Sequence, residues 1–130
     1  MRYVRFRDPA GTVRRGIYGD SRLEAAGRSY DIDDPEIELL APCEPSKIVC
    51  VGFNYPAHAD EVDEEIPERP SLFFKTPNAV VPHGATIELL PRKEEITYEG
   101  ELAVVIGEQC RNVDAADAEN VVHGYTCMND

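Results

Sequence analysis

The chain has 130 residues, of which 42% are hydrophobic, and it carries a formal net charge of -12. This length suits one domain with a modest core and excludes two complete domains of ordinary size. The excess of acidic side chains argues against nucleic acid or an anionic membrane surface as a partner.

The N-terminal stretch MRYVRFRD alternates charged and apolar residues, unlike a signal peptide. No window approaches the roughly 18 consecutive apolar residues of a membrane helix, so we expect a cytoplasmic protein. The four cysteines (Cys43, Cys50, Cys110 and Cys127) form no C-x-x-C pair. We therefore expect reduced, mostly buried thiols. The acidic excess is either a solvated surface or an adaptation to high salt.

Residues 1 to about 40 are expected to form a small β-rich unit. Val4 and Phe6 alternate with arginines, DPAG supplies a turn, and TVRRGIYG is typical of the returning strand. The segment DSRLEAAG predicts one short helical turn that ends at Gly27. Two prolines in LLAPCEPSK favour an extended linker near Pro42 to Ser46. The predicted domains are therefore 1–42 and 43–130.

The second domain is predicted to be rich in strands. KIVCVGFNY has the pattern of a strand buried on both faces and ending at Gly52, and PAHADEVDEE indicates a short helix from Pro56. Strands are expected in SLFFK, in TPNAVVPHGATIEL after a turn, in ITYEGELAVVIG as the longest, and in YTCMND. An amphipathic helix is expected from Asp114 to about Val122, ending before Gly124. The predicted fold class is α+β, strand-rich, with a mixed sheet.

Glu99 and Glu101 are two residues apart on the expected strand ITYEGELAVVIG. Alternate residues of a strand share one face, with Cα atoms about 6.6 Å apart. The two carboxylates therefore lie side by side and repel each other unless a cation lies between them. Mg²⁺ or Mn²⁺, which prefers oxygen ligands, fits that position. An acidic outer face of an edge strand explains the same spacing.

A second candidate pair is His58 and Glu61, three residues apart beyond the end of a strand. In a helix these positions are neighbours, so the carboxylate orients the imidazole for taking a proton from water. A solvent-exposed loop histidine is the alternative. Lys75 at the end of SLFFK either reaches solvent or holds an anionic substrate. His83 is expected in a turn and His123 at a helix C-terminus. Asn129 and Asp130 offer a further oxygen ligand.

Taken in order, KIVCVGFNYPAHADE, PSLFFKTPNAVVPHG, YEGELAVVIG and GYTCMND resemble the fumarylacetoacetate hydrolase family. The resemblance runs from about Lys47 to Asp130, and the preceding strands resemble the small N-terminal domain of many members. It implies a mixed β-sandwich roll as the catalytic domain, incomplete here because the family's domain continues past ND. It also implies a homodimer.

Carried over by position, the resemblance implies that Glu99, Glu101 and Asp130 bind Mg²⁺ or Mn²⁺. It further implies that His58 and Glu61 activate water on a segment that orders over the substrate. Lys75 is the expected substrate contact, although its motif reads KTPN here, and Phe53 departs from residues common in the family.

The activity implied by the resemblance is metal-dependent hydrolysis of a C–C bond in a 2-oxo acid or 1,3-dicarbonyl compound, as in aromatic catabolism. The metal would act as a Lewis acid on substrate oxygens. A hydratase, an isomerase, an oxaloacetate decarboxylase and an inactive truncated binding module remain open as alternatives.

Overall fold

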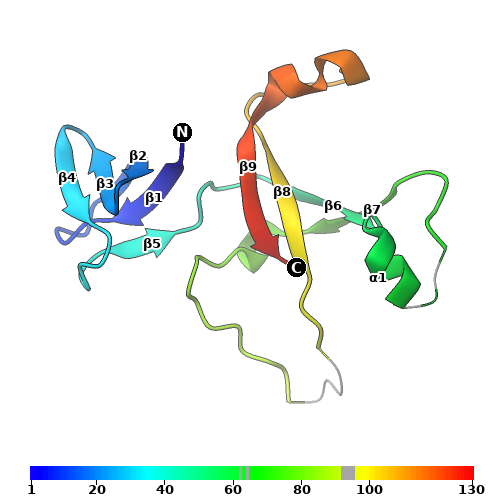
Figure 1. Cartoon of the computed structure of the whole chain (residues 1–130), viewed down its shortest axis with the longest axis horizontal. Helices are drawn as coiled ribbons and strands as arrows, with labels where there is room; N and C mark the ends of the chain where they lie inside the picture. Colours follow the sequence, from blue (N-terminus) through cyan, green and yellow to red (C-terminus); the bar gives the residue numbers. More distant parts are fainter. Residues whose placement is uncertain (62, 64, 92–95) are drawn as a thin grey trace. The chain divides into compact units, whose positions relative to one another are not determined.

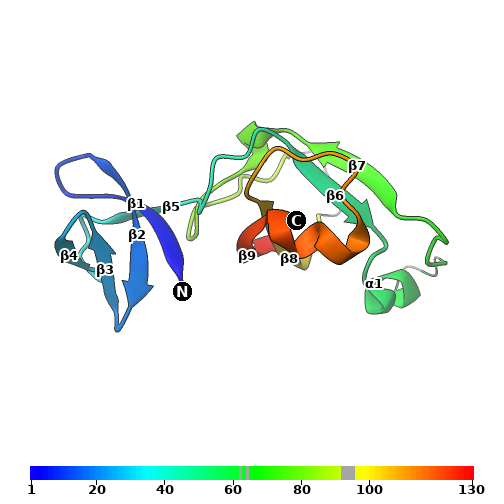
Figure 2. The same ribbon diagram turned by 90° about the horizontal axis from the view of Figure 1, so that it is seen from above.

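The structure is a computed structural model that describes residues 1–61, 63, 65–91 and 96–130. It divides into two compact units, Met1–Gly84 and Ala85–Asp130. The first unit contains a five-stranded antiparallel sheet, ordered β4-β3-β2-β1-β5 (Figures 1 and 2). Its strands are β1 (Tyr3–Arg7), β2 (Val13–Gly19), β3 (Arg22–Ala25), β4 (Arg28–Asp31) and β5 (Glu38–Leu40).

The core of this sheet consists of three fully or almost fully buried side chains, Phe6, Leu23 and Ala25. Alternate residues of each strand point inward, and Phe6 makes an edge-to-face contact with Tyr30 at a centroid distance of 5.1 Å. The predicted strands around Val4 and TVRRGIYG are confirmed as β1 and β2. β5 ends at Leu40, ahead of the expected domain boundary, which stays a prediction.

The helical turn expected in DSRLEAAG is wrong, because this segment forms β3. Leu23 and Ala25 are both buried two residues apart, which is the period of a strand. Two tight turns flank the strand. Asp20 and Ser21 have φ angles of 50° and 62°, and Ala26 and Gly27 have φ angles of 50° and 72°, as the favoured two-residue hairpin turns require.

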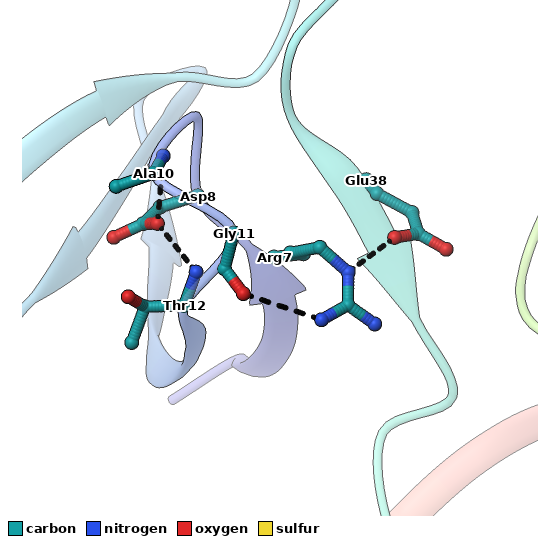
Figure 3. A network of polar contacts seen from close by, with 6 residues as sticks. All are labelled: Arg7, Asp8, Ala10, Gly11, Thr12 and Glu38. Atoms are coloured by element: carbon teal, nitrogen blue, oxygen red, sulfur yellow. Dashed lines mark hydrogen bonds and ion pairs between the residues drawn. The ribbon is translucent and has the colours of Figure 1, made fainter.

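A buried aspartate organises the turn between β1 and β2. Asp8 is 3% exposed. Figure 3 shows its Oδ1 atom accepting hydrogen bonds from the backbone N–H groups of Ala10 and Thr12, at 3.1 and 2.8 Å. Its Oδ2 atom accepts from Arg14 Nε at 2.8 Å. The Thr12 backbone bond and then the Arg14 side chain hold the pKa of Asp8 below its ordinary value.

The first unit also contains an antiparallel ribbon of β6 (Ile48–Gly52) and β7 (Ser71–Lys75), side by side in Figures 1 and 2. Both strands agree with the prediction, but β6 is buried on one face only. Cys50 is buried, whereas Val49 and its partner Phe74 are exposed on the other face. Among the described residues, too little chain packs on that second face to bury it.

Short helical segments follow both strands of this ribbon. α1 (Pro56–Glu61) begins at Pro56 as predicted, and its expected extension includes residues 62 and 64, which lie outside the described part. η1 (Pro77–Ala79) is a 3₁₀ turn. The strand expected in TPNAVVPHGATIEL is wrong, since residues 80–90 have no regular strand. His83 lies in a turn, as expected.

The second unit is built on β8 (Gly100–Ile106) and β9 (Val122–Asn129), connected through the 3₁₀ helix η2 (Ala115–Val121). The segment expected to form an α-helix forms a tighter 3₁₀ helix. Gly124, which was expected to end that helix, belongs to β9 instead. Asp114 occupies the N-cap position without a side-chain capping bond. His123 is also in β9, beside a register shift, and not at a helix C-terminus. β9 is longer than β8.

The four cysteines are free thiols, as expected. The expectation that most are buried is wrong, because Cys50 is buried while Cys110 and Cys127 are exposed. Cys127 projects from the uncovered face of β9 together with Tyr125. Within the described ranges, no helix is long and apolar enough to cross a membrane.

The contrast between two phenylalanines tests this description of the core. We expect Phe6→Ala to lower the free energy of unfolding by about 3–5 kcal/mol, because it leaves a cavity in the sheet. Phe74 is 71% exposed, so we expect Phe74→Ala to change the free energy of unfolding by no more than about 0.5 kcal/mol. Urea unfolding followed by circular dichroism measures both. A large loss in Phe74→Ala would contradict the uncovered face of β7.

The stability that Asp8 contributes should depend on pH. Since its pKa is lowered in the folded chain, its contribution is complete above the unfolded-state pKa of about 3.9 and is lost as pH falls through the folded value. Asp8→Asn should therefore melt earlier than the parent chain at pH 7, with a smaller difference at pH 3. Asp33→Asn, at an exposed aspartate, is the control. A difference that does not change with pH would contradict the assignment.

Candidate metal centre and catalytic residues

Three carboxylates gather at one end of the β8–β9 ribbon. Antiparallel pairing aligns Gly100 with Asn129, so the start of β8 lies beside the end of β9 (Figure 1). Glu99 and Glu101 flank Gly100, and Asp130 follows Asn129. One carboxylate oxygen from each of Glu99, Glu101 and Asp130 lies within 4.8 Å of the others. The ladder thus brings Asp130 close to two acids that precede it by 29 and 31 positions.

Two hydrogen bonds hold the chain ends that carry these acids. The N–H of Asp130 donates to the carbonyl oxygen of Glu99 at 2.8 Å. The N–H of Glu99 donates to Asn129 Oδ1 at 3.1 Å. Asn129 therefore uses its side-chain oxygen to position Glu99. The sequence suggested Asn129 as a possible ligand and contained no signal for this positioning contact.

The alternation of β8 separates the acids from the apolar side chains. Glu99, Glu101 and Asp130 are each half-buried. Leu102 and Val104 occupy the opposite face of β8 and are exposed, as is Tyr125 across the ladder. The prediction that both glutamates lie on one face is confirmed. The expectation that the apolar face of β8 lies in the core is wrong for the described chain, because no described residues bury that face.

The spacing of the acids fits a hard divalent cation. Two like charges about 5 Å apart repel by about 1 kcal/mol in water and about 3 kcal/mol near a protein surface. Around octahedral Mg²⁺, with bonds of about 2.1 Å, ligand oxygens lie about 3.0 or 4.2 Å apart. Oxygens within 4.8 Å of one another reach such a shell by small side-chain rotations. A bound Mg²⁺ or Mn²⁺ would also remove the repulsion.

The other predicted pair, His58 and Glu61, lies on α1 in the first compact unit. The two residues are one helical turn apart, as predicted. The His58 N–H donates to the Tyr55 carbonyl oxygen at 3.0 Å, and Ala59 beside it is buried. The imidazole stacks on the Phe53 ring at a centroid distance of 6.2 Å. Glu61 is exposed and His58 is half-buried.

Lys75 is the last residue of β7 and pairs with Ile48 across the ladder. Its side chain is half-buried. It lies in the first compact unit, with His58 and Glu61, whereas the three acids lie in the second. The part of Lys75 in substrate binding stays a prediction.

Comparison with known proteins identifies the family of the chain. Residues 47–130 match the family described as fumarylacetoacetate (FAA) hydrolase C-terminal. The chain belongs to the fumarylacetoacetate hydrolase family. The matched range includes all six residues suggested above: His58, Glu61, Lys75, Glu99, Glu101 and Asp130.

Two similar proteins are named as oxaloacetate tautomerases. The chain is 46% identical over 103 residues to oxaloacetate tautomerase YisK of Bacillus subtilis, which covers 73% of this chain and 33% of that protein. It is 36% identical over 118 residues to the human mitochondrial oxaloacetate tautomerase FAHD2A, covering 86% and 38% of the two chains.

The fold is that of solved family members. The 5-carboxymethyl-2-hydroxymuconate delta-isomerase from Mycobacterium smegmatis superimposes with a TM-score of 0.85 and 38% identity. The match covers 100% of this chain and 54% of that one. The chain thus spans about half the length of the solved structure it resembles, and less of the two tautomerases.

Metal titration tests the carboxylate cluster. We expect Mn²⁺ to bind saturably, and Glu101→Gln to weaken that binding at least about tenfold because one oxygen ligand loses its charge. At an Mn²⁺ concentration 100 times the Kd, the parent chain should gain about 2.7 kcal/mol of stability. Isothermal titration and thermal melting measure the two effects.

The control for this titration is Glu108→Gln, at an exposed acid just beyond β8. It removes the same charge outside the cluster and should bind Mn²⁺ as the parent does. Equal Mn²⁺ affinities of Glu101→Gln and Glu108→Gln would contradict a metal site in the cluster.

Proposed function

We propose that the whole protein is a divalent-metal-dependent enzyme acting on a 2-oxo acid or a 1,3-dicarbonyl compound. The observation that carries this proposal is the cluster of Glu99, Glu101 and Asp130, whose ligand oxygens lie within 4.8 Å of one another. Family membership supports it, since the relatives compared above are named as enzymes that act on small acids. The chain covers only part of these relatives, so the activity is proposed for the whole protein.

The residues of this chain take separate roles in the proposal. When bound by the three acids, Mg²⁺ or Mn²⁺ supplies Lewis acidity that stabilises negative charge on substrate oxygens. His58 accepts a proton, and Glu61 one turn away orients the imidazole. Lys75 pairs with a substrate carboxylate through its ammonium group.

The reaction that we propose first is hydrolysis of a C–C bond next to a carbonyl. His58 takes a proton from water, and the resulting hydroxide attacks that carbonyl carbon. The bond to the neighbouring carbon then breaks, and that carbon keeps the electron pair. The fragment leaves as an enolate and is then protonated. This use of His58 is supported by its place one helical turn from an acid, on a short helix in which the His58 side chain is half-buried.

Proton transfer without cleavage of a C–C bond is the second candidate reaction. Two relatives are named oxaloacetate tautomerases and one solved relative is named a delta-isomerase. In a tautomerase, a base removes a proton from the carbon next to the carbonyl and a proton is added to oxygen. The same carboxylate cluster and the same histidine serve this reaction, so the substrate decides between the two candidates.

The two reactions are separated by assay of the whole protein with Mn²⁺. An acylpyruvate that is hydrolysed releases pyruvate, whereas tautomerisation of oxaloacetate changes its enol absorbance without releasing pyruvate or CO₂. We expect His58→Gln to lower the active reaction by about 10² to 10⁴-fold, because it removes the proton acceptor. His83→Gln, at a turn histidine, should keep the parent rate. Release of CO₂ from oxaloacetate would favour a decarboxylase, and Mn²⁺ binding without any turnover would contradict an enzyme.

A further inference from the structure

The three carboxylates are held to the β8–β9 ladder to different degrees. Glu101 is inside β8, whereas Glu99 lies one residue before this strand and Asp130 one residue after β9. Residues 96–98, ahead of Glu99, have no regular structure. Because the backbone sets the direction in which a side chain leaves it, the placement of Glu99 and Asp130 depends on contacts that extend the ladder beyond the two strands.

One side chain supplies a bond that the backbone would supply in a regular ladder. Continued by one residue beyond β8 and β9, the register places Glu99 opposite Asp130. In a hydrogen-bonded antiparallel pair, the two residues exchange both N–H to carbonyl bonds. The Asp130 N–H donates to the Glu99 carbonyl oxygen at 2.8 Å, but the Glu99 N–H donates to Asn129 Oδ1 at 3.1 Å. The amide oxygen of Asn129 thus takes the place of a backbone acceptor.

The chemistry of an asparagine suits this position. Its short side chain carries an uncharged oxygen that accepts a hydrogen bond, whereas an aspartate would add a fourth negative charge near three that already repel. Asn129 alternates with Met128 and Asp130 along the chain, so its side chain leaves the ribbon on the face opposite the acids. Across the ladder, Gly100 has no side chain, and a Cβ atom added there would meet no described atom within 4 Å.

We infer that Asn129 is a positioning residue for the metal centre, and that its side-chain oxygen raises the affinity for a divalent cation. The inference rests on the proposed function, in which Glu99, Glu101 and Asp130 bind that cation. Holding the Glu99 N–H limits the conformations of the residue that carries the carboxylate, so less freedom is lost when the cation binds. Partners that orient metal ligands change metal affinity by about 10- to 100-fold. Because this hydrogen bond is exposed to solvent, we expect the lower end of that range.

Replacement by leucine removes the acceptor without adding a charge. We expect Asn129→Leu in the whole protein to keep the fold and to bind Mn²⁺ about tenfold more weakly than the parent, as measured by isothermal titration at about pH 8. Asn129→His should recover most of the affinity, because Nδ1 of an imidazole that is neutral at this pH accepts a hydrogen bond and is as many bonds from the backbone as Oδ1. A merely structural role predicts a lower melting temperature with an unchanged Mn²⁺ affinity.

Two variants control for this replacement. Asn120→Leu removes an exposed hydrogen bond of another asparagine, which runs from Asn120 Nδ2 to Asp117 Oδ1 at 3.2 Å in η2. Gly100→Ala adds a methyl group on the same face of the ribbon as Asn129 and leaves the acceptor in place. Both variants should bind Mn²⁺ as the parent does. Binding about tenfold weaker in Asn120→Leu would overturn the inference, because the loss of affinity would then not require the contact with Glu99.

Amide hydrogen exchange, followed by NMR, tests the bond without any metal or activity. In the metal-free protein, exchange of the Glu99 N–H with solvent should be slowed by its hydrogen bond. It should be faster in Asn129→Leu and slow again in Asn129→His. An exchange rate that is the same in Asn129→Leu as in the parent would overturn the inference, because Asn129 would then not hold this group.

The titrations separate this inference from the proposed function. If the whole parent protein shows no saturable Mn²⁺ binding, the metal centre of the proposed function is overturned, and the positioning role with it. Binding that Glu101→Gln weakens and Asn129→Leu does not would overturn the positioning role alone. Binding weakened by both replacements, with recovery in Asn129→His, supports both proposals. Absence of recovery in Asn129→His overturns the role of the acceptor.

Discussion

The antiparallel ladder between β8 and β9 is the interaction on which the candidate metal centre depends. It pairs Gly100 with Asn129 and so places Glu99, Glu101 and Asp130 within 4.8 Å of one another. Three carboxylates at that spacing repel, and side chains alone would turn apart. The backbone bond from Asp130 to Glu99 and the Asn129 side chain hold them together. A divalent cation bound by the three carboxylates would relieve the repulsion that remains between them.

The same ladder divides the ribbon into two chemically different faces. One face carries the acids, and the other carries exposed apolar side chains such as Leu102 and Tyr125. A two-stranded ribbon is at best marginally stable alone, and an uncovered apolar face adds nothing to its stability. Any contact that covers the apolar face would steady the strands and therefore lower the cost of gathering the acids. Order on the apolar face would therefore be linked, through the shared backbone, to any cation affinity of the acidic face.

Much of this arrangement could be predicted because strand alternation is written in the sequence. The strand around Phe6 and the common face of the two glutamates follow from a period of two, and the strand around Cys50 follows from a continuous apolar run. The hairpin at β3 could not be recognised, since LEAA suits a helix locally and only burial of Leu23 against Phe6 decides for a strand. The contact between Asn129 and Glu99 spans 30 residues, so no local pattern contains it. The stack of Phe53 on His58 depends on a backbone angle that sequence propensity argues against.

The three carboxylates and His58 are thus held by two different kinds of contact. The carboxylate cluster depends on a ladder of backbone hydrogen bonds, which tolerates changes of side chain as long as the register remains. His58 lies on a six-residue helix beside a buried alanine and contacts the Phe53 ring, and these neighbours are all close to it in the sequence. Substitutions near α1 can therefore alter the surroundings of His58 without changing the register of a strand. We therefore expect substitutions to be tolerated more readily around α1 than at the three carboxylates, because the ladder ties each acid to the register of two strands.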